Sequence, residues 1–270
     1  MKFKFFSLIT GSAGLLGKHH ARGLLNLKKD LILTDIDLKK CIEISKKLKK
    51  EYPDQQILCF KLDVTSEKSV KNLIKNLRKK KIIISVLINN AAIDAKFIKE
   101  KNNNDSRLES FSLKKWSHEI NVGLTGAMIC SKHFGPIMSK YCKNGIILNI
   151  ASDLSVISPN QRIYKIKGVA SNRQSVKPIT YSVIKHGIIG LTKYLATYWP
   201  EKNVRCNALS PGSVLNKQSS KLVKELKKMI PLNRLANENE YTAAIEFLCS
   251  DKSSYMTGQN IIIDGGRSTW

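Results

Sequence analysis

The chain has 270 residues, of which 42% are hydrophobic and 25% charged, and its mean hydropathy is −0.21. This composition is that of one globular domain with a deep core, and no apolar run reaches the roughly 18 residues that a bilayer-spanning helix needs. The formal net charge of +25 suggests nucleic acid or an anionic membrane as a partner. However, the lysines come as scattered doublets, without interleaved aromatic residues or a nucleic-acid-reading motif. This distribution favours solvated helix faces and argues against both partners.

Short apolar runs alternate with longer helical patterns along the whole chain. Strands are predicted at Phe5–Thr10, Leu31–Asp35, Ile57–Leu62, Ile82–Asn89, Gly145–Ala151, Asn203–Ala208 and Gln259–Asp264. Helices are predicted at Leu15–Leu27, Leu38–Lys50, Glu67–Lys79 with Ser66 as its cap, Leu113–Ser139, Ile179–Tyr198 and Asn239–Ser250. This alternation predicts an α/β protein in which residues 1–270 form one domain with a Rossmann fold, a doubly wound seven-stranded parallel sheet with helices on both faces.

Two polar stretches, 93–110 and 153–177, fit no element and follow the fourth and fifth strands. They are therefore expected at the carboxyl edge of the sheet, where α/β proteins bind ligands. The opening segment runs directly into a glycine turn, not into a small-residue cleavage site, so we expect a first strand and a cytoplasmic protein.

Six cysteines are spread along the chain without a C-x-x-C pair, which favours reduced and mostly buried thiols over disulfides. His19 and His20 are adjacent, without the i, i+4 spacing of a metal site on a helix, and are expected as surface or helix-start residues. No metal is expected.

A glycine-rich turn follows the first strand and opens the first helix. Its residues are Thr10-Gly11-Ser12-Ala13-Gly14-Leu15-Leu16-Gly17. Gly11 is expected to make the tight turn, Gly14 to let backbone N–H groups approach a pyrophosphate, and Gly17 to let the helix lie close to the strand. An ordinary strand-to-helix turn would show the same letters, so the pattern needs support from elsewhere in the chain.

That support is Asp35, which ends the second strand eighteen residues after Gly17. A carboxylate there can accept both hydroxyls of an adenine ribose and would repel a 2′-phosphate, which favours NAD over NADP. Asp35 could instead cap the next helix, although Asp37 is better placed for that role.

Tyr181 and Lys185 stand at i and i+4 of a predicted helix, so both face one side of it. A neighbouring ammonium favours the phenolate and moves the tyrosine pKa toward the working range, which makes the pair a proton-transfer candidate. The same spacing occurs by chance in many helices; Tyr164, for example, has Gly168 at i+4.

Further segments resemble those of the short-chain dehydrogenase/reductase family over nearly the whole chain. They are the glycine turn, Leu62-Asp63-Val64, Asn89-Asn90-Ala91-Ala92, Asn149-Ile150-Ala151-Ser152, Tyr181-x-x-x-Lys185 and Thr257-Gly258-Gln259-Asn260. The T-G-x-x-G-x-x-G spacing is usual in the longer extended members, and Ala92 stands where glycine is commoner. The chain length and its ending resemble the classical members, with which we group the protein.

The resemblance implies a catalytic set of Asn121, Ser152, Tyr181 and Lys185, with Ser155 as a rival for the serine role. It also implies cofactor contacts from Thr10, Gly11, Gly14, Leu15, Leu16, Gly17, Asp35, Asp63, Val64, Asn89, Ala91, Tyr181, Lys185, Pro211, Gly212 and Val214. In this interpretation Asp63 contacts the adenine and the segment after the sixth strand holds the nicotinamide carboxamide.

Twenty-eight residues separate Ser152 from Tyr181, more than family members usually have there, and the insert is polar and basic. It is either a solvated surface loop or a lid for a hydrophilic substrate, including an anionic one. This insert resembles a subgroup found with bacterial surface-glycan and flagellin-modification genes, which implies a sugar or sugar phosphate as substrate. The resemblance also rests on Ile179-Thr180-Tyr181-Ser182, Lys193-Tyr194-Leu195-Ala196-Thr197-Tyr198-Trp199 and Trp270. The alternatives are a 3-oxoacyl-carrier-protein reductase, a catalytically silent dinucleotide-binding regulator and a basic nucleic-acid-binding protein. The family resemblance further implies a homo-oligomer, a tetramer or a dimer.

Overall fold

The structure is a computed structural model that describes residues 3–93 and 106–270. Its centre is a seven-stranded, fully parallel sheet in the order β3-β2-β1-β4-β5-β6-β7. The strands are β1 (Lys4–Thr10), β2 (Asp30–Asp35), β3 (Ile57–Lys61), β4 (Ile82–Asn89), β5 (Gly145–Ile150), β6 (Val204–Pro211) and β7 (Asn260–Ile263). The strand order reverses between β1 and β4, and such a switch point opens a ligand crevice at the carboxyl edge.

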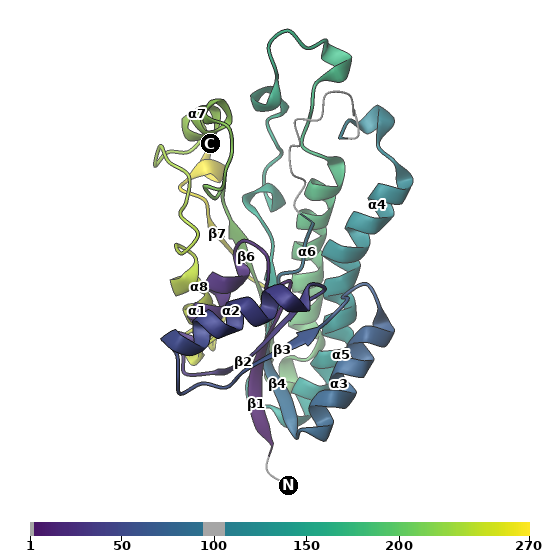
Figure 1. The fold of residues 1–270 in the computed structure, drawn as a ribbon, viewed down its shortest axis with the longest axis vertical. Helices are drawn as coiled ribbons and strands as arrows, with labels where there is room; N and C mark the ends of the chain where they lie inside the picture. The colour runs from purple at the N-terminus through teal and green to yellow at the C-terminus, as the bar shows by residue number, and fades with distance from the viewer. Residues whose placement is uncertain (1–2, 94–105) are drawn as a thin grey trace.

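Helices cover both faces of the sheet (Figure 1). They are α1 (Gly17–Asn26), α2 (Leu38–Glu51), α3 (Glu67–Lys79), α4 (Leu113–Ile120), α5 (Gly126–Tyr141), α6 (Ile179–Tyr198), α7 (Ser220–Lys228) and α8 (Thr242–Leu248). Helices α1, α2 and α8 lie on one face and α3, α5 and α6 on the other. The predicted doubly wound Rossmann fold is confirmed.

The core divides into two layers because side chains alternate along each strand. Phe6 and Leu8 of β1 pack toward α3 and α5, whereas Ile9 packs toward α1 and α8. All three are fully buried. Both faces of the strands therefore read as apolar, as expected for a parallel sheet covered on both sides.

Helix caps follow the sequence closely at two positions. Ser66 accepts a hydrogen bond from the Ser69 N–H at 3.2 Å and caps α3 as predicted. Asp37 accepts from the Lys40 N–H at 3.2 Å and caps α2, so the capping role belongs to Asp37 and not to Asp35.

The predicted helix Leu113–Ser139 is helical throughout, but a π-helical turn divides it and it ends two residues later than predicted. The chain forms α4, then a π-helical turn at Asn121–Thr125, then α5, which ends at Tyr141. The Gly126 N–H donates to the Asn121 carbonyl oxygen, an i→i+5 bond that inserts one extra residue into the turn. Both sides of the bulge are helical, so the sequence pattern predicted one continuous helix and gave no sign of the one-residue shift.

Helix α7 was not predicted. It is short, and Ser219 caps it by accepting from the Leu222 N–H at 3.3 Å. Its apolar face packs on the 3₁₀ turn Gln161–Tyr164, which includes the buried Ile163. A contact with a distant loop stabilises this helix, and a local pattern does not reveal such a contact.

Several ends also differ from the prediction. Helix α1 begins at Gly17, two residues later than expected, because the glycine turn extends through Leu16. Helix α8 is shorter than the predicted Asn239–Ser250. Strand β6 continues to Pro211 because its ladder with β7 runs on to Ile263. Among the described helices, none is both long and apolar enough to cross a bilayer.

The two histidines expected at the surface or the helix start lie on α1 with their side chains buried. His19 Nε2 hydrogen-bonds Glu238 at 3.1 Å. His20 is fully buried, and burial lowers its pKa to about 3. Both rings face inward because α1 packs against the sheet and α8.

Candidate active site

The glycine turn lies at the switch point between β1 and β4. Gly11 has φ +61°, and a Cβ there would lie 2.6 Å from the Ala91 Cα. A Cβ on Gly17 would lie 2.3 Å from the Ser12 carbonyl oxygen. Positive φ at Gly11 and the close approach at Gly17 both require glycine, which agrees with the roles predicted for these two positions.

The turn also offers backbone donors. Within the described residues, the N–H groups of Leu15 and Leu16 donate to no protein acceptor. They precede the first residue of α1, where the helix dipole favours an anion, and Gly14 beside them is exposed. Unpaired donors at an exposed helix N-terminus fit a pyrophosphate group.

Asp35 lies beside this turn at the end of β2 and is half-buried. Its Oδ2 accepts from the Ala13 N–H at 3.0 Å, and its Oδ1 accepts from the Asp37 N–H at 3.0 Å. The carboxylate therefore bridges the glycine turn and the start of the next helix. A carboxylate offers about four acceptor positions, so it can still receive ribose hydroxyls.

Asn90 holds the same turn from β4. Its side-chain amide donates to the carbonyl oxygens of Thr10 at 3.1 Å and Gly11 at 2.8 Å. The Thr10 hydroxyl accepts from the Ala91 N–H at 3.1 Å. By contrast, Asn89 points into the core, where it donates to Ser131 and Asn149. The residue that contacts the glycine turn through its side chain is thus Asn90, which was not among the predicted site residues.

Asp63 and Val64 follow β3. The Asp63 Oδ1 accepts from both the N–H and the hydroxyl of Thr65, at 2.9 and 2.7 Å, which fixes the turn before α3. Val64 is buried, and a Cβ on Gly126 would lie 2.7 Å from its Cγ2. The absence of a side chain at Gly126 thus lets α5 pack close to this turn.

Pro211 ends β6, and Gly212 and Val214 follow it at the same carboxyl edge. The Gly212 N–H donates to the Ile263 carbonyl oxygen at 2.8 Å, and a Cβ on Gly212 would lie 2.6 Å from the Asp264 Cα. Val214 forms a parallel bridge with Ala236. The segment predicted to hold the nicotinamide is therefore a stiff, tightly packed backbone.

Tyr181 and Lys185 lie one turn apart near the start of α6. The Lys185 Nζ is 5.8 Å from the centre of the Tyr181 ring and donates to the Ile150 carbonyl oxygen at 2.9 Å. Lys185 is only 7% exposed. Since Ile150 ends β5 two residues before Ser152, this bond ties the helix to the strand end that carries the predicted serine.

Asn121 is the first residue of the π-helical turn and is exposed to solvent. The turn packs against α6, because a Cβ on Gly123 would lie 2.8 Å from Ile184 Cγ2. A π bulge shifts side chains from their helical positions and is frequent at functional sites. Asn121 therefore lies on an element in contact with the helix of Tyr181 and Lys185.

Ser152 follows β5 and is buried. Its hydroxyl donates to the Asp153 Oδ1 at 2.8 Å and accepts from the Leu154 N–H at 3.2 Å. The other Asp153 oxygen pairs with Arg267 Nη1 at 2.7 Å, and these two side chains are 4% and 7% exposed. The predicted rival, Ser155, instead contacts Ser210 at 3.0 Å and the Asn260 amide at 3.3 Å.

A family profile described as enoyl-(acyl carrier protein) reductase matches residues 11–268. The chain belongs to the classical short-chain dehydrogenases/reductases. It is 29% identical over 264 residues to the 7alpha-hydroxysteroid dehydrogenase of Bacteroides fragilis, covering 96% of this chain and 92% of that protein. It is 31% identical over 263 residues to the 3-oxoacyl-[acyl-carrier-protein] reductase FabG of Thermotoga maritima, covering 96% of both.

Two further similarities bear on the site. The chain is 26% identical over 258 residues to the post-translational flagellin modification protein A of Campylobacter coli, covering 96% of both proteins. A short-chain dehydrogenase from Leptospira borgpetersenii with bound NAD+ superimposes with a TM-score of 0.80 at 28% identity, covering 99% of this chain and 94% of that one. The dehydrogenase described here is thus an oxidoreductase of the alcohol/ketone type, acting on CH–OH groups.

The long insert of this dehydrogenase is irregular, as predicted, apart from three 3₁₀ turns: Asp153–Ser155, Gln161–Tyr164 and Ser171–Arg173. Side-chain-to-backbone bonds organise it. The Gln174 amide accepts from the Ile166 N–H at 2.7 Å and donates to the carbonyl oxygens of Ile166 and Val169. Arg107 donates to the Ser171 carbonyl oxygen at 3.0 Å. The other predicted substrate loop, 93–110, lies largely outside the described residues, which omit 94–105.

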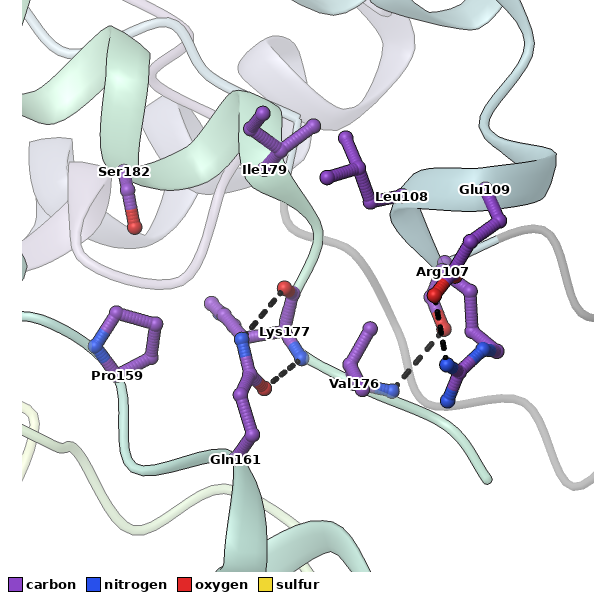
Figure 2. A pocket seen from close by; sticks show the side chains of 10 residues that line it. Arg107, Leu108, Glu109, Pro159, Gln161, Val176, Lys177, Ile179 and Ser182 are labelled. Atoms are coloured by element: carbon purple, nitrogen blue, oxygen red, sulfur yellow. Dashed lines mark hydrogen bonds and ion pairs between the residues drawn. The ribbon is translucent and has the colours of Figure 1, made fainter. Parts of the chain in front are cut away.

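A pocket of about 350 Å³ lies between the insert and residues 106–109 (Figure 2). It is lined by Ser106, Arg107, Leu108, Glu109, Pro159, Gln161, Val176, Lys177, Ile179 and Ser182. Its lining includes Ile179 and Ser182, which lie with Tyr181 in the first turn of α6. Polar and apolar side chains both contribute, and Arg107 forms an ion pair with Glu109 at 3.0 Å.

Sequence reasoning did not single out Asn90 or the Asp153–Arg267 pair, and it treated Lys177 only as one of the basic residues of the insert. Asn90 stood in the quoted Asn89-Asn90-Ala91-Ala92 motif, from which only Asn89 and Ala91 were named as cofactor contacts. No local signal could have joined Asp153 to Arg267, which are 114 residues apart. Within the described residues, no group of three or more His, Cys, Asp or Glu side chains is placed to hold a metal ion.

Proposed function

We propose that the protein is an NAD-dependent dehydrogenase or reductase that interconverts a secondary alcohol and a ketone through Tyr181, Lys185, Ser152 and Asn121. The observation that carries this proposal is the buried Lys185 ammonium one helical turn from Tyr181 and bonded to the end of β5. In oxidation, the Tyr181 phenolate accepts the proton of the carbinol hydroxyl, and in reduction the phenol returns it. A bound NAD supplies the hydride acceptor or donor.

The other residues support this proton transfer. The Lys185 ammonium has three donors, one of which goes to Ile150, and its charge favours the phenolate. Ser152 contributes a hydroxyl that can hydrogen-bond the substrate oxygen, and Asn121 a side chain that can hold a water between Lys185 and solvent. An intact set of these four residues argues against a catalytically silent dinucleotide-binding regulator.

We further propose NAD as the preferred cofactor. The unpaired N–H groups of Leu15 and Leu16 fit its pyrophosphate, and the Asp35 carboxylate suits ribose hydroxyls but repels a 2′-phosphate. The related Leptospira dehydrogenase was crystallised with NAD+. Asp63 and Val64 would lie on the adenine side, and Asn89, Ala91, Pro211, Gly212 and Val214 along the nicotinamide half.

The proposed substrate is a sugar or sugar phosphate used in surface-glycan biosynthesis. Support comes from the similarity to flagellin modification protein A and from the polar, basic insert beside Tyr181. The alternative is reduction of a 3-oxoacyl carrier protein, favoured by the 31% identical FabG and by the basic surface. Asp35 argues against it, since those reductases normally use NADPH. The scattered lysines argue against a nucleic-acid-binding protein.

The deciding experiment is a screen of sugars, sugar phosphates and polyols with NAD, followed by absorbance of the reduced nicotinamide, with Tyr181→Phe protein as the blank. A parallel arm offers a 3-oxoacyl thioester with NADH or NADPH. Turnover of a sugar-class substrate that the blank lacks supports the proposal. Turnover of the thioester alone, with NADPH, would replace it by the reductase alternative.

We also propose a cytoplasmic homo-oligomer, a tetramer or a dimer. Exposed apolar side chains lie along α6 at Val183, Tyr194 and Tyr198. Such patches mark association surfaces. Sedimentation analysis of the full chain tests this proposal, and a monomer at micromolar concentration would contradict it.

A further inference from the structure

The insert returns to α6 through a side-chain clamp at Lys177. The Gln161 amide accepts from the Lys177 N–H at 2.8 Å and donates to the Lys177 carbonyl oxygen at 3.3 Å, as the paired dashed lines in Figure 2 show. Both polar atoms of one amide thus hold both backbone groups of one residue. This arrangement fixes the direction in which the Lys177 side chain leaves the chain.

The neighbours of Lys177 are fixed as well. On one side, the Val176 N–H donates to the Ser106 hydroxyl at 3.1 Å. On the other side, Pro178 is buried and stands directly before the first residue of α6. Since proline has a fixed φ and no N–H, the chain enters the helix at a set angle. Lys177 therefore sits on a constrained backbone although it ends a 25-residue irregular stretch, 153–177.

The consequence of this constraint is that the Lys177 Nζ lies 3.7 Å from the centre of the Tyr181 ring. The Lys185 Nζ, by comparison, is 5.8 Å from the same centre. The tyrosine proposed to transfer the proton thus has an ammonium four residues before it and another four residues after it. A cation within about 6 Å of a ring centre is attracted to the ring. The same cation stabilises the phenolate form of tyrosine more strongly than the neutral phenol form.

Two acidic groups on the elements around Tyr181 are already partnered. Glu119 of α4 is buried and accepts a hydrogen bond from the Thr180 hydroxyl. Asp153, on the 3₁₀ turn that packs against α6, is paired with Arg267. The two acidic groups are thus bound to other partners, while both lysines approach the ring itself.

We propose that Lys177 is a second cationic residue of the proton-transfer site, placed by the Gln161 clamp to stabilise the Tyr181 phenolate together with Lys185. The catalytic role of Lys177 rests on the proposed function, in which Tyr181 transfers the proton. This placement of Lys177 also gives the long insert a role in catalysis, since the insert delivers a charge to the reacting side chain.

Spectrophotometric titration of the apo-protein tests the proposal without any substrate. Phenolate absorbance is followed against pH in the full chain, and the same titration of the Tyr181→Phe protein is subtracted to isolate Tyr181. Removing a cation raises the pKa of a neighbouring phenol, so in Lys177→Met the Tyr181 midpoint should move up by about one pH unit. Lys177→Arg keeps a cation and should restore the midpoint.

Two further variants serve as controls. Lys167→Met removes an exposed lysine of the same insert and should leave the midpoint unchanged. Gln161→Ala removes the clamp and should move the midpoint in the same direction as Lys177→Met, but by less. An unchanged Tyr181 midpoint in a folded Lys177→Met protein would overturn the inference.

The outcome is separable from that of the proposed function. If Tyr181 is not the proton-transfer residue, the midpoint still shifts in Lys177→Met, whereas Tyr181→Phe retains turnover. Once a substrate is found, the rising limb of kcat/KM against pH for alcohol oxidation should move to higher pH in Lys177→Met. A purely structural role of Lys177 would lower activity equally at every pH.

Discussion

The glycine-turn region and the long insert are held in place in different ways. Around the turn, Gly11 packs closely against Ala91 and Gly17 against Ser12, and Asn90 donates to the carbonyl oxygens of Thr10 and Gly11. The insert has few buried side chains and relies on amide clamps from Gln161 and Gln174. The first region is therefore fixed along its backbone by close packing, whereas the second is held at a few anchor points.

The sharpest way to separate binding from chemistry is Tyr181→Phe, in which kcat should fall about 10²–10⁴-fold. Phenylalanine keeps the ring and its packing but lacks the oxygen that exchanges the proton, so NAD affinity should be unchanged. Steady-state kinetics and calorimetric titration with NAD measure the two effects. Retention of most activity would remove Tyr181 from the mechanism, and Tyr164 at the insert would be tested next.

Asp153→Ala tests whether the buried ion pair at the end of β5, where the insert begins, contributes to the stability of the protein. The variant leaves Arg267 buried without its partner, and the free energy of unfolding should fall by about 3–5 kcal/mol. Urea unfolding measures the loss. The control is Lys228→Ala, which breaks an exposed pair with Glu225 and should cost less than about 1 kcal/mol. Equal losses of unfolding free energy in Asp153→Ala and Lys228→Ala would contradict the expected difference between a buried and an exposed ion pair.

Gly17→Ala tests the tight packing of the glycine turn. A Cβ there meets backbone atoms of Ser12, so we expect a loss of about 1–3 kcal/mol in the free energy of unfolding, with weaker NAD binding. Gly190→Ala is the matched control on α6, where nothing lies within 4 Å of the added Cβ. Its stability should be unchanged or rise by up to about 1 kcal/mol, since alanine favours helix.

His20 should make the cofactor side of the sheet sensitive to acid. Burial lowers the His20 pKa to about 3 from the usual 6.5, so the unfolded chain binds the extra proton between these values. Stability should therefore fall by up to about 1.4 kcal/mol per pH unit below pH 6.5. Thermal unfolding from pH 7 to pH 5 measures the slope. In His20→Leu the stability should depend less steeply on pH. The same slope in both proteins would mean that groups other than His20 cause the acid sensitivity.

Asp35→Ala should give the smallest effect, a reduction of about tenfold in the preference for NAD over NADP. The variant also removes the acceptor for the Ala13 and Asp37 N–H groups, so both cofactors should bind more weakly and the ratio of affinities is the informative measurement. Asp37→Ala, which removes only the α2 cap, should leave that ratio unchanged. Equal affinity of the unchanged protein for NAD and NADP would exclude the assignment.

The sequence by itself determined the doubly wound fold, most strand and helix positions, and the Ser66 and Asp37 caps. These depend on local quantities, namely side-chain alternation, helical period and the bonding of a cap to its own first turn. Gly11 and Gly17 could be predicted for the same reason, since a strand-to-helix turn has few solutions.

Only the tertiary structure decided what depends on distant partners. The π turn at Asn121, helix α7, the Asp153–Arg267 pair and the position of Lys177 over Tyr181 each rest on a contact that local periodicity does not encode. The side chains of Asn89 and Asn90 show the same limit on a small scale. Asn89 ends β4 and Asn90 follows it; consecutive side chains point to opposite sides, and only folding shows that the Asn90 side chain contacts the glycine turn.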